Sequence, residues 1–470
     1  MSDATEPSGA KVRPWDRLWV QIALAIFLVL AVFAVAFYGF AVIGTHPARL
    51  WPWSAKTHPG LYELSRTAVP VAALVGGAAA IVVGIRRQRS TEKTVELTAR
   101  TAQITADAYA LDQKRAGREE IDRLRDRYTT IAAQLGDDAA PVRLAGVYAM
   151  AALADDWITM GNHREAQVCI DVLCAYIRTP RNTSTSEDAV ADTRVRETIT
   201  RVITQHLQEG ATTSWSDKAF DFTEAHFTGS HSFSGARFND GCRVAFLGAE
   251  FNKGCLVDFS DARFNDGCRV DFSDARFNDG CWVTFPSAWF NDGCWVTFPS
   301  AWFNDGCRVT FLGARFNDGC RVTFPEARFN DGCWVTFPSA WFNDGCRVTF
   351  PSARFNDGCR VTFPEARFNK GCLATFLIAH FNDGCRVDFS AARFNDGCRV
   401  DFPDAWFNDG CRVDFSDAWF NDGCRVTFPG VQFNEASEVD FATAGFNEGW
   451  PIGPWGEDPP PLGVWSPSAH

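Results

Sequence analysis

Histidine, tyrosine and methionine are scarce in this 470-residue sequence, which contains 8, 6 and 3 of them. So few histidines exclude a His-rich set of metal ligands, and the chain also lacks a nucleophile–base–orienter set and a phosphate-binding glycine loop. Cations are outnumbered, with 45 Lys and Arg against 57 Asp and Glu. General affinity for nucleic-acid backbones is therefore not expected, because neutralising phosphates requires clustered cations. The sequence predicts no enzyme, no cofactor and no metal site.

Phenylalanine, tryptophan and cysteine are instead abundant, with 41, 17 and 17 copies. From Cys242 to Cys424 the cysteines recur every 13 residues, and only Cys169 and Cys174 fall outside this pattern. Such regularity makes the cysteines part of an internal repeat rather than a secreted disulfide framework. Cys169, Cys174 and His163 do not make a tetrahedral zinc set, so we assign them to packing.

A first membrane span is predicted at residues 18–43, after a short tail at 1–17, because this stretch carries no charge. It is long enough to cross a hydrocarbon core of about 30 Å. A cleavable signal peptide is the alternative, but no clear small-x-small cleavage site closes the apolar run.

A second span is predicted at residues 67–85, after an external loop at 44–66. Four small residues recur at every fourth position along it: Ala72, Gly76, Ala80 and Gly84. Such a stripe lets another helix approach closely in lipid, either the first span or a second copy of the protein. The alternative is that Ala and Gly are simply common in membrane helices.

Positive charges flank the two spans and set the expected topology. Lys11, Arg13 and Arg17 precede the first span, and a group of Arg and Lys residues beginning at Arg86 follows the second. The positive-inside rule then places both termini in the cytoplasm of a bacterial plasma membrane. The lipid bilayer is therefore an expected partner, and structural disulfides are not expected in a reducing compartment.

A helical stalk is predicted at residues 86–136, ending in an amphipathic or coiled-coil seam formed by Ile121, Leu124, Tyr128, Ile131 and Leu135. A further helical module is predicted at 137–215. Self-association through the spans or the stalk is one expectation. The segment at 127–156, RYTTIAAQLGDDAAPVRLAGVYAMAALADD, resembles a juxtamembrane module of actinobacterial proteins. That resemblance covers about residues 112–178 and implies an architecture, not a chemistry.

The C-terminal half repeats units such as FNDGCRVDFSDAR, with Asn-Asp-Gly as a turn signal. After the turn, apolar residues alternate with polar ones, so one side is expected to form the core: Phe264, Cys268, Val270, Phe272, Ala275 and Phe277. The V-x-F and A-x-F pattern resembles the pentapeptide-repeat family. This resemblance implies a right-handed, four-sided β-solenoid over residues 216–447, following the two transmembrane helices and the helical linker.

Coil size follows from volume, because a 13-residue coil would crowd two Phe, a Val, a Cys and an Ala into a layer about 4.8 Å thick. A 26-residue coil is favoured over a 13-residue coil, giving eight or nine coils. The inward cysteines are interpreted as small apolar filler, since zinc or iron–sulfur binding needs thiolates that converge. Calcium binding at the turns is the weaker alternative, because the Gly-Gly-x-Gly-x-Asp pattern is missing.

Function is sought on the outer face, where many outward positions of the repeat units hold either tryptophan or arginine. The candidate interaction surface comprises Trp282, Trp289, Trp295, Trp302, Trp334, Trp341, Trp406 and Trp419, with Arg269 and Arg276. Exposed Trp beside Arg is typical of interface anchors. The alternative is a Trp/Arg cross-strand ladder that only covers the coils.

The sequence thus predicts a membrane-anchored, non-catalytic scaffold that presents a repeat solenoid to an unknown protein partner. The alternative is a membrane-tethered mimic of DNA that regulates topoisomerase, as the family resemblance implies. Outward Asp and Arg positions alternate, however, and no continuous negative stripe is evident in the sequence. The tail at 448–470, rich in Pro, Gly and Trp, is expected either to cap the last coil or to be disordered.

Overall fold

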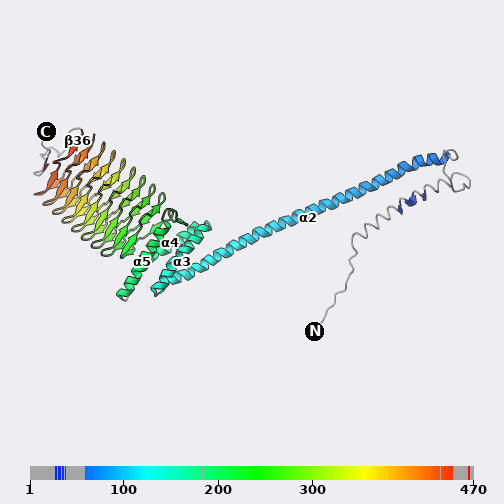
Figure 1. Cartoon of the computed structure of the whole chain (residues 1–470), viewed down its shortest axis with the longest axis horizontal. Coiled ribbons are helices and arrows are strands. Elements are labelled where there is room, and N and C mark those ends of the chain that lie inside the picture. Colours follow the sequence, from blue (N-terminus) through cyan, green and yellow to red (C-terminus); the bar gives the residue numbers. More distant parts are fainter. Residues whose placement is uncertain are drawn as a thin grey trace. The chain divides into compact units, whose positions relative to one another are not determined.

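The structure is a computed structural model that describes residues 59–180, 185–434 and 436–447, with a few positions in 27–38 and the pair 464–465. It divides into two units, residues 1–119 and 120–470, and each is described by itself. The first unit contains most of the long helix α2 (Pro59–Leu135). The second contains the end of α2, a helical module and the solenoid (Figure 1).

Helix α2 runs without interruption through the residues predicted as the second span and the stalk. The first predicted span lies almost entirely outside the described residues, as do the side chains of the early second span, including Ala72. Over the part of the chain that the structure describes, no helix is both long and apolar enough to cross a membrane. Gly76, Ala80 and Gly84 are exposed. A Cβ built on either glycine meets nothing within 4 Å.

The last turns of α2 pack inside the chain. Leu124, Ile131 and Leu135 are buried, and Ile121 and Tyr128 are partly buried against the same core. Of the two interpretations of this seam, amphipathic packing within the chain is therefore the one found, and a coiled-coil contact with another chain is not. This face of α2 meets the helical module, so it is not available to a partner.

The helical module consists of α3 (Ala140–Thr159), α4 (His163–Arg178) and α5 (Ser186–His206). Pro141 lies in the first turn of α3, where its missing N–H costs nothing. Helix α5 begins after Thr185, whose hydroxyl oxygen accepts a hydrogen bond from the Asp188 N–H. Helix α3 crosses close to α2 at Gly146, where an added Cβ would lie 3.1 Å from the Leu135 nitrogen.

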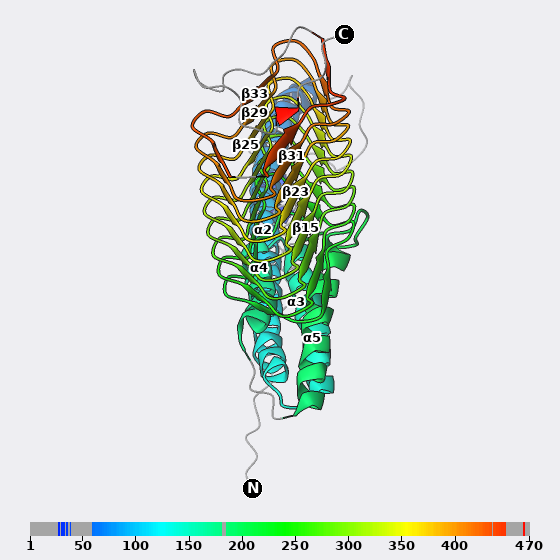
Figure 2. The same cartoon turned by 90° about the vertical axis from the view of Figure 1, so that its left-hand side faces the viewer.

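The repeats form a right-handed β-solenoid of about nine coils, each coil contributing one strand to each of four parallel sheets. Residues pair with those 26 positions away, as in Arg263↔Trp289 and Phe264↔Phe290. The 26-residue coil is thus confirmed and the 13-residue coil is wrong. Figure 2 shows the stack turned by 90°, with the helical module at the first-coil end.

The chain passes through the four sheets in a fixed order, so they are numbered first to fourth. The first sheet contains β1 (Phe220–Asp221), β5 (Arg243–Ala245), β9 (Arg269–Asp271), β13 (Trp295–Thr297), β17 (Arg321–Thr323), β21 (Arg347–Thr349), β25 (Leu373–Thr375), β29 (Arg399–Asp401) and β33 (Arg425–Thr427). The second contains β2 (His226–Phe227), β6 (Glu250–Phe251), β10 (Arg276–Phe277), β14 (Trp302–Phe303), β18 (Arg328–Phe329), β22 (Arg354–Phe355), β26 (His380–Phe381), β30 (Trp406–Phe407) and β34 (Gln432–Phe433).

The other two sheets are built in the same way. The third contains β3 (Ser230–Ser232), β7 (Leu256–Asp258), β11 (Trp282–Thr284), β15 (Arg308–Thr310), β19 (Trp334–Thr336), β23 (Arg360–Thr362), β27 (Arg386–Asp388), β31 (Arg412–Asp414), β35 (Glu438–Asp440) and β37 (Val464–Trp465). The fourth contains β4 (Arg237–Phe238), β8 (Arg263–Phe264), β12 (Trp289–Phe290), β16 (Arg315–Phe316), β20 (Trp341–Phe342), β24 (Arg367–Phe368), β28 (Arg393–Phe394), β32 (Trp419–Phe420) and β36 (Gly445–Phe446).

Stacked phenylalanines fill the interior, and every residue predicted for the core is buried there: Phe264, Cys268, Val270, Phe272, Ala275 and Phe277. Each Phe lies parallel to its equivalent in the next coil, as where the ring centroids of Phe272 and Phe298 are 4.7 Å apart. Offset stacking of this kind adds about 0.5–1.5 kcal/mol per pair to the burial energy. The core is therefore a set of continuous aromatic columns.

Two kinds of corner turn the chain. In the Asn-Asp-Gly corner the glycine has positive φ, for example +69° at Gly267, which glycine adopts without strain. In the other corner a residue with a side chain has positive φ, as at Asp274 (+54°). Its N–H donates to the Pro299 carbonyl oxygen of the next coil at 2.8 Å, so the inter-coil bond stabilises this conformation.

Both ends of the solenoid are covered at least in part. Helices α4 and α5 lie against the strands β1 and β3 of the first coils, with Trp215 fully buried below them. At the other end β37 adds to β35 in the third sheet. The two described residues of the tail therefore extend the third sheet.

Candidate functional site

Tryptophan and arginine form ladders along the outside of the coils. Arg308 lies between two tryptophans, with its guanidinium carbon 4.9 Å from the Trp282 ring centre and 4.6 Å from that of Trp334. Arg269 stacks on one tryptophan, with its guanidinium carbon 4.9 Å from the Trp295 ring centre. Arg276 instead forms an ion pair with the Glu250 carboxylate at 3.5 Å. The cross-strand ladder is thus present, and it occupies indole faces that would otherwise be open to a partner.

The ladders of the third and fourth sheets combine into one surface, which we call the Trp–Arg patch: Trp282, Trp289, Arg308, Arg315, Trp334, Trp341, Arg360 and Arg367. The two sheets are joined by the corner at 285–288, so each coil places a matching pair of residues on two adjoining sides of the solenoid. Pairs of Trp and pairs of Arg alternate from one coil to the next. Trp282 and Trp341 remain 44% and 42% exposed although Arg stacks on them, so indole edges and guanidinium groups are what a partner would meet.

The other predicted tryptophans lie elsewhere on the solenoid. Trp295 is in the first sheet, Trp302 and Trp406 are in the second, and Trp419 is at the far end of the fourth. Trp302 stacks with Arg328 at 4.4 Å, and Trp406 stacks with His380. The structure therefore divides the eight predicted tryptophans into a group of four in one patch and four scattered ones.

Two columns of exposed aspartates run along opposite corners of the coil and were missed in the sequence. Between the fourth and first sheets lie Asp240, Asp266, Asp292, Asp318, Asp344, Asp396 and Asp422, interrupted by Lys370. Between the second and third sheets lie Asp279, Asp305, Asp331, Asp357, Asp383 and Asp409. The Asp of each Asn-Asp-Gly turn was interpreted as a turn signal and, as a weaker alternative, as a calcium ligand, although its regular spacing also predicts a column.

The cysteine columns serve as more than apolar filler. The thiols from Cys268 to Cys424 each donate to a carbonyl oxygen of the coil before, as where Cys320 Sγ lies 2.9 Å from the Asn291 oxygen. At the end of this series Ser437 takes the cysteine position, and its hydroxyl donates to the Asn408 oxygen at 2.7 Å. Burial raises the pKa of Cys242 to about 12, so this thiol stays protonated and donates to the Lys218 oxygen. Asparagine side chains add a parallel column, for example Asn291 to Asn265 at 3.3 Å.

A buried ionic cluster joins the helical module to the first coil. Asp192 accepts hydrogen bonds from Arg196 Nε at 2.6 Å and from the Tyr176 hydroxyl at 2.7 Å, and Arg143 lies 3.8 Å away. Arg196 also donates to the carbonyl oxygens of Ile177 and Thr179 in the connection between α4 and α5. These contacts explain how charged groups that are 4–7% exposed are tolerated, and they assign the cluster to structure.

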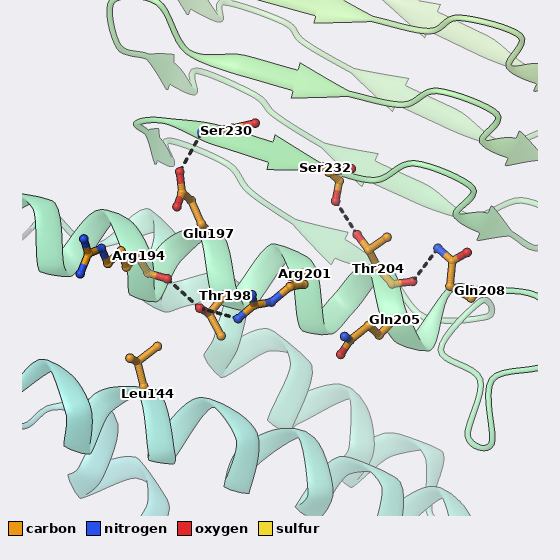
Figure 3. Close-up of a pocket in the computed structure, with 10 residues that line it drawn as sticks. All are labelled: Leu144, Arg194, Glu197, Thr198, Arg201, Thr204, Gln205, Gln208, Ser230 and Ser232. Carbon is orange, nitrogen blue, oxygen red and sulfur yellow. Dashed lines mark hydrogen bonds between the residues drawn. The ribbon is translucent and has the colours of Figure 1, made fainter.

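An open groove of about 580 Å³ lies where α5 meets α3 and β3 (Figure 3). Several of its polar groups are engaged with one another: Glu197 accepts from the Ser230 N–H at 3.0 Å, and Thr204 donates to the Ser232 carbonyl oxygen at 2.6 Å. Arg201 donates to the Tyr148 hydroxyl at 3.1 Å. The groove is therefore a joint between helix and solenoid. Among the described residues no group of three or more His, Cys, Asp or Glu is arranged to hold a metal ion.

The helical module also contains a histidine that lies between two hydrogen-bond acceptors. His206 lies between the Val202 carbonyl oxygen, 2.7 Å from Nδ1, and Asp155, 3.0 Å from Nε2. Both partners are acceptors, so both bonds form only when the ring carries two protons. Burial alone would lower the pKa of His206, but the bonds to Asp155 and Val202 and the charge of Asp155 raise it above its ordinary value.

Comparison with known families identifies the type of repeat. Residues 222–271 match the family described as Pentapeptide repeats (9 copies). These are pentapeptide repeats, and in this chain they fold as coils of a β-solenoid. No curated protein matches the chain. The match covers the first coils, and the same 26-residue register continues from there to β36.

Proposed function

We propose that the protein is a non-catalytic scaffold that binds a protein partner through the Trp–Arg patch. The observation that supports this proposal is the gathering of four tryptophans and four arginines on two adjoining sheets. Tryptophan and arginine are enriched among residues that dominate binding energy. Because Arg already stacks on the indole faces, the partner would contact indole edges with apolar groups and guanidinium N–H groups with carboxylates or carbonyls.

The aspartate columns limit which partners fit this patch. One column follows each outer edge of the surface formed by the third and fourth sheets, so a polyanion lying across it would meet rows of carboxylates. Nucleic acid is therefore disfavoured as a ligand of the patch. A folded protein with a compact acidic and apolar contact surface fits between the columns.

A proximity-labelling or pull-down comparison tests the proposal. The variant W282A/W289A/W334A/W341A removes all four tryptophans of the Trp–Arg patch. The variant W295A/W302A/W406A removes tryptophans from the first and second sheets and is the matched control. We expect the first variant to lose specific partners by about tenfold or more in recovery and the second to retain them. Equal recovery by wild type and both variants would rule out the patch as the interface. Circular dichroism of each variant checks that the solenoid is intact.

Anchoring in the plasma membrane by residues 18–43 and 67–85, with both termini cytoplasmic, is part of the same proposal. Its support is the length and apolar character of these sequences and the positive charges that flank them. Fusing a reporter to the C-terminus tests the topology. A C-terminus found outside the cytoplasm, or a chain released by carbonate washing, would contradict the anchor without affecting the patch.

Mimicry of DNA is a second candidate, which the aspartate columns favour. Their carboxylates repeat once per coil, about every 4.8 Å. The column from Asp279 to Asp409 is unbroken, and the other is interrupted by Lys370. Competition of the whole protein with DNA for topoisomerase tests this function. Replacing Asp279, Asp305, Asp331, Asp357, Asp383 and Asp409 by Asn should abolish any competition. Absence of an effect of the wild-type protein at micromolar concentration would exclude it.

A further inference from the structure

Among the described residues, none packs against the part of α2 between residues 75 and 120. Every described side chain from 75 to 120 is exposed. An isolated helix of this length depends on its own propensity alone, whereas most helices in proteins are stabilised by packing an apolar face. The helix therefore has a free face along more than ten turns.

One face of this helix carries large apolar residues at a heptad spacing. Leu97, Ile104 and Leu111 lie seven residues apart, and they are 63%, 68% and 50% exposed. Thr94, Thr101 and Ala108 lie three residues before each of them. Alternating steps of three and four are the pattern by which two helices pack side by side in a left-handed coiled coil.

The threonines on this face do not need a polar partner. Thr94 donates its hydroxyl to the Ser90 carbonyl oxygen, and Thr101 donates to that of Leu97, both at 2.8 Å within the helix. Their methyl groups are left to pack against a neighbour. Charged groups are also paired within the helix, as Arg100 with Glu96 at 2.8 Å. The apolar stripe is thus the part of this surface that lacks a contact.

The same heptad phase continues toward the N-terminus. Gly76 lies three heptads before Leu97, and Ala80 lies three heptads before Thr101. Two of the four small residues predicted to pack helices, Gly76 and Ala80, therefore share a face with the leucine and isoleucine stripe, separated from it by Arg87 and Ser90. A second copy of this chain supplies the same small and large residues in the same order, so it matches the whole length of the stripe.

We propose that two copies of this chain associate through the stripe formed by Leu97, Ile104 and Leu111. The stalk is then a two-stranded coiled coil, and each dimer presents two solenoids. This inference does not rest on the Trp–Arg patch, because the two surfaces belong to different units of the chain. A partner bound through two solenoids would gain avidity when both can be engaged at once.

Light scattering after size-exclusion chromatography of the whole protein in a mild detergent tests the association. Replacing Leu97, Ile104 and Leu111 by Asp buries three carboxylates in each helix of the dimer, so the dimer dissociation constant should rise about 100-fold or more. The protein mass would then fall to that of one chain. The three side chains are exposed among the described residues, so the helical module and the solenoid should fold as in the wild type.

The opposite face of the same helix provides the matched control. Val95 and Tyr109 are as exposed, at 63% and 67%, but lie away from the stripe. The variant V95D/Y109D should keep the dimer mass, and I104C should form a disulfide-linked dimer on mild oxidation, because position 104 faces its own equivalent in a parallel dimer. A wild-type protein of single-chain mass, or a triple Asp variant that keeps the dimer mass, would overturn the proposal.

Discussion

The inside and the outside of the solenoid follow different rules. Inward positions repeat almost without variation, with Phe, Cys, Val and Ala stacked on their own kind in successive coils. Outward positions change between Arg, Trp, Leu, His and Gln in the same register. The interior is constrained by volume, because each layer must fill the same space. The exterior is free of that constraint, so differences there are where function is to be sought.

A substitution inside one coil tests this contrast with the largest expected effect. Phe324 is fully buried and stacks on Phe298 and Phe350 at 4.6 and 4.8 Å. Phe324→Ala should lower the free energy of unfolding by about 4 kcal/mol, because it leaves a cavity in a column. Arg347→Ala, at an outward position, should change it by less than about 0.5 kcal/mol. Denaturant unfolding followed by circular dichroism measures both, and similar losses would contradict the contrast.

The buried ionic cluster around Asp192 is charged, unlike the apolar interior of the solenoid, so stability should be sensitive to the loss of one of its charges. Asp192→Ala leaves Arg196 and Arg143 buried without their carboxylate and should cost about 3 kcal/mol. Asp221 pairs with Arg178 at 2.7 Å in a half-exposed setting, and Asp221→Ala should cost less than about 1 kcal/mol. Thermal unfolding of the two variants decides whether burial makes the difference. An equal cost would mean that the cluster is not essential.

The cysteine columns give a smaller and more specific test. Cys320→Ala removes the donor to the Asn291 carbonyl oxygen and should cost about 1–2 kcal/mol. Cys320→Ser keeps a donor, as Ser437 does in the last coils, and should cost less. Chemical denaturation of the two variants in reducing buffer provides the comparison. If alanine is tolerated better than serine, the cysteines are apolar filler after all.

The smallest expected effect is a pH dependence in the helical module. The bonds to Asp155 and Val202 raise the pKa of His206 against the opposing effect of burial, so its charged form is favoured in the folded state. This contribution to stability is complete at acidic pH and is lost as the pH rises through the raised pKa of His206. The thermal midpoint of wild type relative to His206→Gln should therefore be higher at pH 6 than at pH 9. A difference that does not change with pH would contradict a charged His206.

Periodicity made the solenoid predictable from the sequence. Spacing of Phe264, Cys268, Val270 and Phe272 identified the inward side, and the volume of one layer selected the 26-residue coil. The helices of the module were also expected, because Pro141 and the apolar spacing of α5 are local signals. Such features depend on residues that are neighbours along the chain or that repeat at a fixed interval.

Three features required the tertiary structure. The seam at Leu124, Ile131 and Leu135 could have met another chain or its own, and only the packing of α3 and α4 decided it. Trp282 and Trp289 became one surface with Trp334 and Trp341 because the path of the coil places the third and fourth sheets on adjoining sides. Turn aspartates such as Asp279 became columns because the coils stack in register.

The sequence by itself therefore determined the repeat, its inward residues and the helical segments, since each follows from local periodicity and layer volume. The tertiary structure alone decided which outward residues are neighbours, because positions 26 residues apart come within one strand spacing only once the coils close. It also decided which faces of α2 are covered. Two surfaces remain open to partners: the Trp–Arg patch and the exposed stripe at Leu97, Ile104 and Leu111.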